Sequence, residues 1–127
     1  MSSSAVAVAE LEPKAIWKHF DALTKIPRPS TKEDAARKYV ISIAQKHGLE
    51  HVQDPAGNLV VRKPATKGRE KAPMAALQGH LDMVCEKNEG TNFNFDTDAI
   101  KVIRREDWLY ADLRELVSQG AGCPVVT

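Results

Sequence analysis

The chain has 127 residues, and its 18 Lys and Arg against 17 Asp and Glu give a formal net charge of +1. This length suits one domain, and 43% hydrophobic with 28% charged residues is typical of a globular protein rather than a disordered one. The even charge gives no support for binding to nucleic acid or to a membrane surface, since both need a concentrated basic patch.

The N-terminus predicts a flexible leader over residues 1–10. This stretch contains no Lys or Arg, and its apolar run is too short for a signal peptide. No run elsewhere approaches the roughly 18–20 apolar residues that a membrane helix needs. Two cysteines, Cys85 and Cys123, are too few for a disulfide framework. We therefore expect a cytoplasmic protein.

The first predicted helix lies between Leu11 and Ile26, where apolar side chains recur at helical spacing. Pro13 suits its first turn. Pro27 and Pro29 end it, because each proline removes an N–H donor and disfavours helical geometry in the preceding residue. The predicted buried face consists of Ile16, Trp17, Phe20 and Leu23.

A second helix is predicted directly afterwards. Ser30-Thr31-Lys32-Glu33 has the form of a capping box, in which the Ser and Glu side chains satisfy free N–H groups of the first turn. Gly48 is a natural C-terminal stop. The predicted buried stripe consists of Ala36, Tyr39, Val40, Ile43 and Ala44.

Beyond Gly48 the apolar period changes to two, which predicts strands. Leu49–Gln53 and Leu59–Arg62 are expected to form a hairpin around the turn Asp54–Asn58. The charged stretch 63–71 is expected to be a solvated loop.

Two further strand regions follow. The apolar run Pro73–Gln78 is predicted to be a buried strand, and Ala99–Ile103 and Trp108–Tyr110 to form a second hairpin. Two helices followed by a mixed sheet of about five strands indicate an α/β fold.

His80 and Asp82, just after the predicted buried strand, are the residues best placed for chemistry. Residues two apart on an extended backbone point to the same side, so these side chains can converge. A metal-bound imidazole commonly gives its second N–H to a carboxylate, which fixes the tautomer. The same pair also fits a structural histidine at a strand end beside a surface aspartate. The spacing alone leaves both interpretations open.

The other histidines, His19, His47 and His51, are expected to be structural or to face solvent. Cys85 lies three residues after Asp82. It could be a soft metal ligand, although a lone cysteine is more commonly a small buried hydrophobe.

Five motifs occur in a specific order: Ile-Pro-Arg-Pro-Ser at 26–30, Lys-His-Gly-Leu at 46–49, Gly-Asn-Leu-Val-Val-Arg at 57–62, Leu-Gln-Gly-His-Leu-Asp-Met-Val at 77–84 and Asp-Trp-Leu-Tyr-Ala-Asp at 107–112. Together they resemble the N-terminal part of the aminoacyl-histidine dipeptidases. These are also called Xaa-His or β-alanyl-histidine (carnosine) dipeptidases, and they belong to the two-zinc amino- and carboxypeptidases. The resemblance implies that residues 11–112 are an incomplete N-terminal part of a two-zinc exopeptidase catalytic domain.

The resemblance also implies site roles. His80 would ligate one metal ion, and Asp82 would be the catalytic carboxylate that orients the His80 ring. The implied reaction is metal-dependent hydrolysis of Xaa-His dipeptides, with two zinc ions as cofactors, or manganese or cobalt in their place. A water between the two ions would be the nucleophile, and a glutamate of the family's Glu-Glu pair would be the general base.

After Asp112 the sequence departs from the family. Gln119 stands about where the family has the aspartate that bridges the metals, and a neutral amide cannot replace that anion. The chain contains no adjacent Glu-Glu pair and no histidine after His80. Neither Cys85, Glu86 nor Glu89 completes a ligand set by recognisable spacing.

Residues 113–127 are therefore expected to be an unrelated or frame-shifted tail, and the chain to be a truncated fragment that is inactive alone. Its partner by resemblance is an Xaa-His dipeptide. The alternative is a non-catalytic module that binds another chain or a single metal ion. A fragment of a larger sheet would expose an apolar edge, through which the chain could self-associate.

Overall fold

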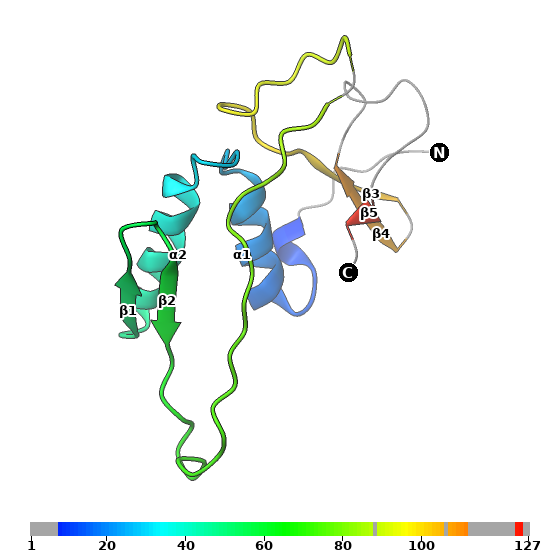
Figure 1. Cartoon of the computed structure of the whole chain (residues 1–127). Coiled ribbons are helices and arrows are strands. Elements are labelled where there is room, and N and C mark those ends of the chain that lie inside the picture. Colours follow the sequence, from blue (N-terminus) through cyan, green and yellow to red (C-terminus); the bar gives the residue numbers. More distant parts are fainter. Residues whose placement is uncertain (1–7, 88, 106, 112–123, 126–127) are drawn as a thin grey trace.

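The structure, a computed structural model, describes residues 8–87, 89–105, 107–111 and 124–125. Two helices form the first half of the described chain, α1 (Lys14–Thr24) and α2 (Asp34–Lys46) (Figure 1). A short 3-10 turn, η1 (Val8–Glu10), precedes them, and Val8 is buried. The remainder of the predicted leader lies outside the described residues.

Helix α1 confirms the first predicted helix, with ends two or three residues inside the predicted limits. Trp17, Phe20 and Leu23 are half-buried, as expected of the apolar stripe. Ile16 is exposed, so its assignment to the buried face was wrong. It lies in the first turn of the helix.

The predicted capping box at the start of α2 was wrong. The helix begins at Asp34, and no side chain caps it. Thr31 has a φ of 74°, so the chain turns sharply between Ser30 and the helix. The Glu33 carboxylate instead accepts a hydrogen bond from the Thr31 N–H at 2.6 Å. The Ser30 hydroxyl is therefore available for another partner.

The rest of α2 follows its prediction. Ala36 and Ala44 are buried, and the other three residues of the stripe are half-buried. Gly48 ends the helix with a φ of 63°, a conformation that glycine adopts without steric cost. The Gly48 N–H donates to the Gln45 carbonyl at 3.0 Å and the Leu49 N–H to the Ala44 carbonyl at 2.8 Å. These two bonds make the Schellman motif that satisfies the free carbonyls of the last turn.

The hairpin β1 (Glu50–Gln53) and β2 (Leu59–Arg62) is confirmed, with antiparallel pairing from Glu50↔Arg62 to Gln53↔Leu59. It lies beside α2 (Figure 1). The Arg37 side chain connects the two, since its Nε donates to the Gly57 carbonyl at 2.7 Å. The hairpin turn is thereby held against the helix.

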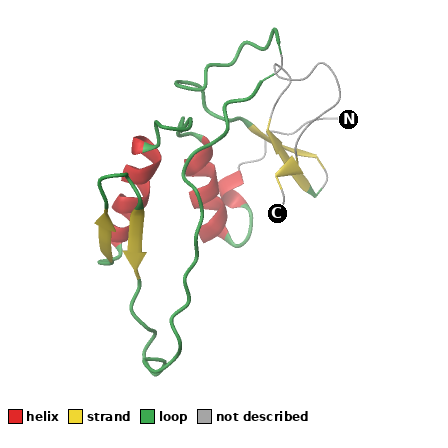
Figure 2. Cartoon of the chain, in the orientation of Figure 1, coloured by secondary structure: helices red, strands yellow, loops and turns green. Residues whose placement is uncertain are grey.

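The predicted buried strand at Pro73–Gln78 was wrong. Figure 2 shows this segment as part of a long loop that leaves β2 and returns past the helices. Met74 and Leu77 are fully exposed or nearly so. A strand requires a hydrogen-bonded neighbour, and no described segment lies alongside this one as a strand partner. Its apolar side chains therefore face solvent.

The second hairpin is confirmed with shifted ends. Its strands are β3 (Val102–Arg105) and β4 (Trp108–Ala111). β5 (Pro124–Val125) pairs with the other edge of β4. The rest of the predicted tail lies outside the described residues. Ile103 and Leu109 are buried in this sheet.

The strands of the described chain form two separate antiparallel sheets, β1-β2 and β3-β4-β5, rather than one mixed sheet. The α/β fold class is confirmed, while the single sheet was wrong because Pro73–Gln78, the expected buried strand, is not paired. In the part of the chain that the structure describes, no helix is long and apolar enough to cross a membrane.

Candidate metal-binding site

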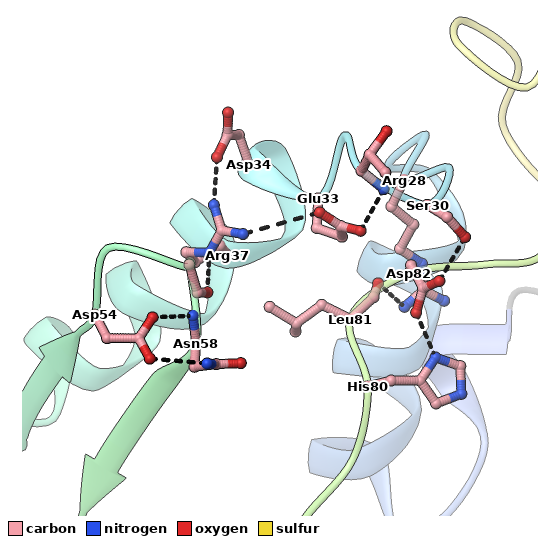
Figure 3. A network of polar contacts seen from close by, with 12 residues as sticks. Arg28, Ser30, Glu33, Asp34, Arg37, Asp54, Asn58, His80, Leu81 and Asp82 are labelled. Atoms are coloured by element: carbon pink, nitrogen blue, oxygen red, sulfur yellow. Dashed lines mark hydrogen bonds and ion pairs between the residues drawn. The ribbon is translucent and has the colours of Figure 1, made fainter.

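His80 and Asp82 lie on an extended segment that runs beside residues 28–30. Pro29 and Met83 form a parallel β-bridge, and the Met83 N–H donates to the Arg28 carbonyl at 2.8 Å. The Arg28 guanidinium also donates to the Leu81 carbonyl at 3.3 Å (Figure 3). Two segments more than fifty residues apart in the sequence are thus held together by backbone and side-chain contacts.

The His80 and Asp82 side chains meet, as the spacing of two residues predicted. The His80 Nδ1 lies 2.8 Å from the Asp82 Oδ1. The pKa of Asp82 is held below its ordinary value, first by the hydrogen bond from Ser30 and then by the one from His80. The carboxylate is therefore ionised at neutral pH and can only accept, so Nδ1 carries the proton of this bond. In the neutral ring the lone pair is then on Nε2, and the His80 side chain is 73% exposed.

Ser30 is the residue of this cluster that the sequence interpretation missed. Its hydroxyl donates to the Asp82 Oδ2 at 2.6 Å. The local pattern assigned Ser30 to a helix cap, and that pattern contains no signal for a partner 52 residues away. The sequence signal that could have pointed to Ser30 is its place in the Ile-Pro-Arg-Pro-Ser motif, which is one of those that carry the family resemblance.

Arg28 brings a positive charge to the same place. Its guanidinium is half-buried, and this desolvation lowers the pKa of Arg28, while the negative charge of Asp82 acts in the opposite direction. The Arg28 Nε is buried and has no hydrogen-bond partner in the described part of the chain. Arg28 thus contacts the His80–Asp82 segment at its backbone and lies near its one carboxylate.

The cluster fits one ligand position of a metal site together with its orienting carboxylate. A catalytic zinc commonly takes three protein ligands and a water. Among the residues that the structure describes, no group of three or more His, Cys, Asp and Glu lies close enough to hold a metal ion. Cys85 is exposed rather than buried, and its Sγ lies 3.7 Å from the Met83 carbonyl oxygen. A complete metal site would need further ligands besides His80 and Asp82, from residues other than the described neighbours of this pair.

The other histidines have local partners or face solvent. His19 on α1 pairs through Nδ1 with the Tyr39 hydroxyl on α2 at 2.7 Å. The His51 Nδ1 lies 3.4 Å from the Leu49 carbonyl oxygen. His47 is exposed at the end of α2. His19 thus joins the two helices and is a structural residue.

Comparisons with known proteins show which proteins this chain resembles. No protein-family model matches the chain. The cytosol non-specific dipeptidase of Escherichia coli (strain K12) is 36% identical over 104 residues, which are 82% of this chain and 21% of that protein. The crystal structure of the aminoacylhistidine dipeptidase from Vibrio alginolyticus superposes with a TM-score of 0.79 at 36% identity. That match covers 84% of this chain and 22% of the Vibrio chain.

The chain thus spans about a fifth of the length of the Escherichia coli and Vibrio dipeptidases. The sequence match and the backbone match agree in identity and in the share of the chain that they cover. In both its sequence and its backbone, this chain resembles one part of the aminoacyl-histidine dipeptidases.

Proposed function

We propose that this chain carries the His80–Asp82 part of the active site of a cytoplasmic, metal-dependent peptidase that hydrolyses Xaa-His dipeptides. The observation that carries the proposal is the 2.8 Å contact between the His80 Nδ1 and the Asp82 Oδ1. It lies in a chain whose relatives are dipeptidases. The name of the Escherichia coli relative supports the cytoplasmic location. Residues 11–112 would then be part of a metallopeptidase catalytic domain.

Each residue has a role in this proposal. His80 would bind a divalent ion through Nε2, because Asp82 holds the proton on Nδ1. Asp82 would orient the ring and make it a stronger ligand, as carboxylates do for metal-bound histidines. When bound, zinc, manganese or cobalt supplies an activated water and polarises the scissile carbonyl. We expect the chain to be inactive alone, since it contains no adjacent Glu-Glu pair to provide the general base.

A chimera tests the proposal. The 104 aligned residues replace their counterpart in the Escherichia coli dipeptidase, and release of free histidine from β-alanyl-histidine and an α-aminoacyl-histidine is measured with zinc or manganese. We expect the chimera to be active. His80→Ala should abolish the activity, and Asp82→Ala should lower metal affinity or kcat/KM by about 10–100-fold.

The matched control is His47→Ala, which removes an exposed histidine at the end of α2. This variant should retain the activity of the chimera. A folded chimera without activity, or a fully active His80→Ala variant, would contradict the proposal. The 127-residue chain is also assayed alone, where we expect no release of histidine. Activity in the chimera together with none in the chain alone would mean that this segment supplies part of the site and the rest of the enzyme supplies the remainder.

The alternative, a non-catalytic module that binds another chain, is favoured by a different observation. Met74 and Leu77 expose large apolar side chains along the unpaired segment Pro73–Gln78, and Val84 exposes another just after the bridge at Met83. Unpaired extended segments of this kind can pair with a second chain. Light scattering during size exclusion, over a range of protein concentrations, tests it. Self-association that Leu77→Lys removes and Thr66→Lys does not would support it, whereas a monomer at all concentrations would contradict it.

A further inference from the structure

Both oxygens of the Asp82 carboxylate are occupied. Oδ1 accepts from the His80 Nδ1 at 2.8 Å, and Oδ2 accepts from the Ser30 hydroxyl at 2.6 Å. Figure 3 shows the carboxylate between the two side chains. Because a carboxylate is planar, the position of one oxygen determines where the other lies. A donor on Oδ2 therefore sets the direction in which Oδ1 faces His80.

Ser30 is itself held in place by its neighbours. Pro29, directly before it, bridges to Met83, directly after Asp82. The N–H of Thr31, directly after Ser30, donates to the Glu33 carboxylate at 2.6 Å. The Ser30 backbone is thus tied both to the segment that carries Asp82 and to the start of α2. The bond between the Ser30 hydroxyl and Asp82 follows from this placement of the two backbones.

Among the residues that the structure describes, the His80 ring has no hydrogen-bond partner besides Asp82. The His80 side chain is 73% exposed, and that of Asp82 is 29% exposed. The terminal torsion of an aspartate is broad and has no single preferred angle. Without a second donor, the carboxylate could therefore rotate away from the ring. Ser30 limits that rotation.

We propose that Ser30 is a positioning residue that holds the Asp82 carboxylate, and through it keeps His80 in the Nδ1–H tautomer with Nε2 directed to a metal ion. The metal part of this inference rests on the proposed function. The tautomer part does not, because it concerns three side chains that the chain itself contains. The two parts can be tested separately.

The experiment uses the full chain without metal. Ring nitrogen shifts of histidine labelled with nitrogen-15 report the tautomer of each neutral imidazole, at a pH where the ring carries no charge. In the parent chain, His80 should be mainly in the Nδ1–H form. Ser30→Ala should move it toward the Nε2–H form, and Ser30→Thr, which keeps the hydroxyl, should restore the parent pattern.

Ser42→Ala is the matched control. Ser42 also donates its hydroxyl, to the Tyr39 carbonyl at 2.7 Å, but it lies on α2 away from the cluster. This variant should leave the His80 tautomer unchanged. A general loss of structure in Ser30→Ala would change backbone amide shifts throughout the chain. Loss of positioning would change the His80 ring shifts and leave most amide shifts as they are in the parent.

Two outcomes would overturn the inference. One is an unchanged His80 tautomer in Ser30→Ala. The other is an equal effect of Ser30→Ala in an Asp82→Ala background, since the effect must pass through the carboxylate.

In the chimera, Ser30→Ala should lower zinc affinity by about 10–100-fold, with recovery in Ser30→Thr. If the tautomer responds but His80→Ala leaves the chimera active, the proposed function fails and the positioning role remains.

Discussion

Arg37 on α2 and Gly57 in the β1–β2 turn are in direct contact. The Arg37 Nε donates to the Gly57 carbonyl at 2.7 Å, and its guanidinium also pairs with Asp34 and Glu33. A Cβ on Gly57 would lie 2.6 Å from the nearest guanidinium nitrogen. Gly57 has a φ of 88°, a conformation that other residues rarely adopt. The helix and the hairpin therefore meet at a position that favours glycine.

Gly57→Ala should destabilise the chain. The left-handed conformation costs a non-glycine residue roughly 1–2 kcal/mol. The methyl group would also displace Arg37 and weaken a charge-assisted hydrogen bond, which is worth about 1.5–3 kcal/mol. Urea unfolding measures the free energy of unfolding and its midpoint.

Gly48→Ala is the control for this prediction. Gly48 has a φ of 63°, yet a Cβ there would meet nothing within 4 Å. Its substitution should cost the backbone strain alone. Equal losses of unfolding free energy in the two variants would show that the contact between Arg37 and Gly57 contributes nothing.

Asn58→Ala should change how the free energy of unfolding depends on pH. The Asn58 side chain and N–H each bond the Asp54 carboxylate at 2.8 Å, and the side-chain bond is the main cause that lowers the Asp54 pKa below 3.8. A lowered folded pKa stabilises the native state above about pH 3.8, and this contribution is lost as the pH falls through the folded pKa. Asn58→Ala should raise the Asp54 pKa toward its ordinary value.

The free energies of unfolding of parent and Asn58→Ala should therefore differ at neutral pH and converge in acid. Carboxyl titration by NMR together with urea unfolding from neutral pH to about pH 2 measures both quantities. Asn92→Ala, which removes an asparagine outside the turn, is the control. A difference that stays constant down to the lowest pH would contradict the role of Asp54.

Leu77 and Leu109 should lose very different amounts of unfolding free energy on the same substitution. Leu77 is fully exposed, and Leu109 in β4 is 2% exposed. Leu109→Ala should cost about 2–5 kcal/mol, because it empties a buried position. Leu77→Ala should stay within about 0.5 kcal/mol of the parent. An equal loss at Leu77 in thermal or urea unfolding would show that this segment is packed in solution.

Arg28→Met should loosen the segment that carries His80. It removes the 3.3 Å hydrogen bond to the Leu81 carbonyl and the positive charge near Asp82. A charge-assisted bond of this kind is worth about 1.5–3 kcal/mol, so hydrogen exchange at the Met83 N–H should become about ten-fold faster or more. Arg69→Met, in the solvated loop, is the matched control. Unchanged protection at Met83 would mean that its backbone bond to Arg28 needs no help from the side chain.

Much of the local structure could be read from the sequence. The prolines after Ile26 end α1, and Gly48 ends α2, as predicted. The turn between Gln53 and Leu59 joins β1 and β2 in the predicted place. These features depend on steric and hydrogen-bond preferences of residues within one or two turns of each other, which a sequence displays directly. The same reasoning brought His80 and Asp82 together, since their spacing is only two residues.

What the sequence determined by itself is the order of helices and hairpins and the meeting of His80 with Asp82. Only the tertiary structure decided the partner of Ser30 and the state of Pro73–Gln78. A serine hydroxyl bonds the acceptor that the fold brings to it, and here that acceptor is Asp82, 52 residues away. An apolar run becomes a buried strand only when other strands pair with it, and apolar composition does not provide the partners.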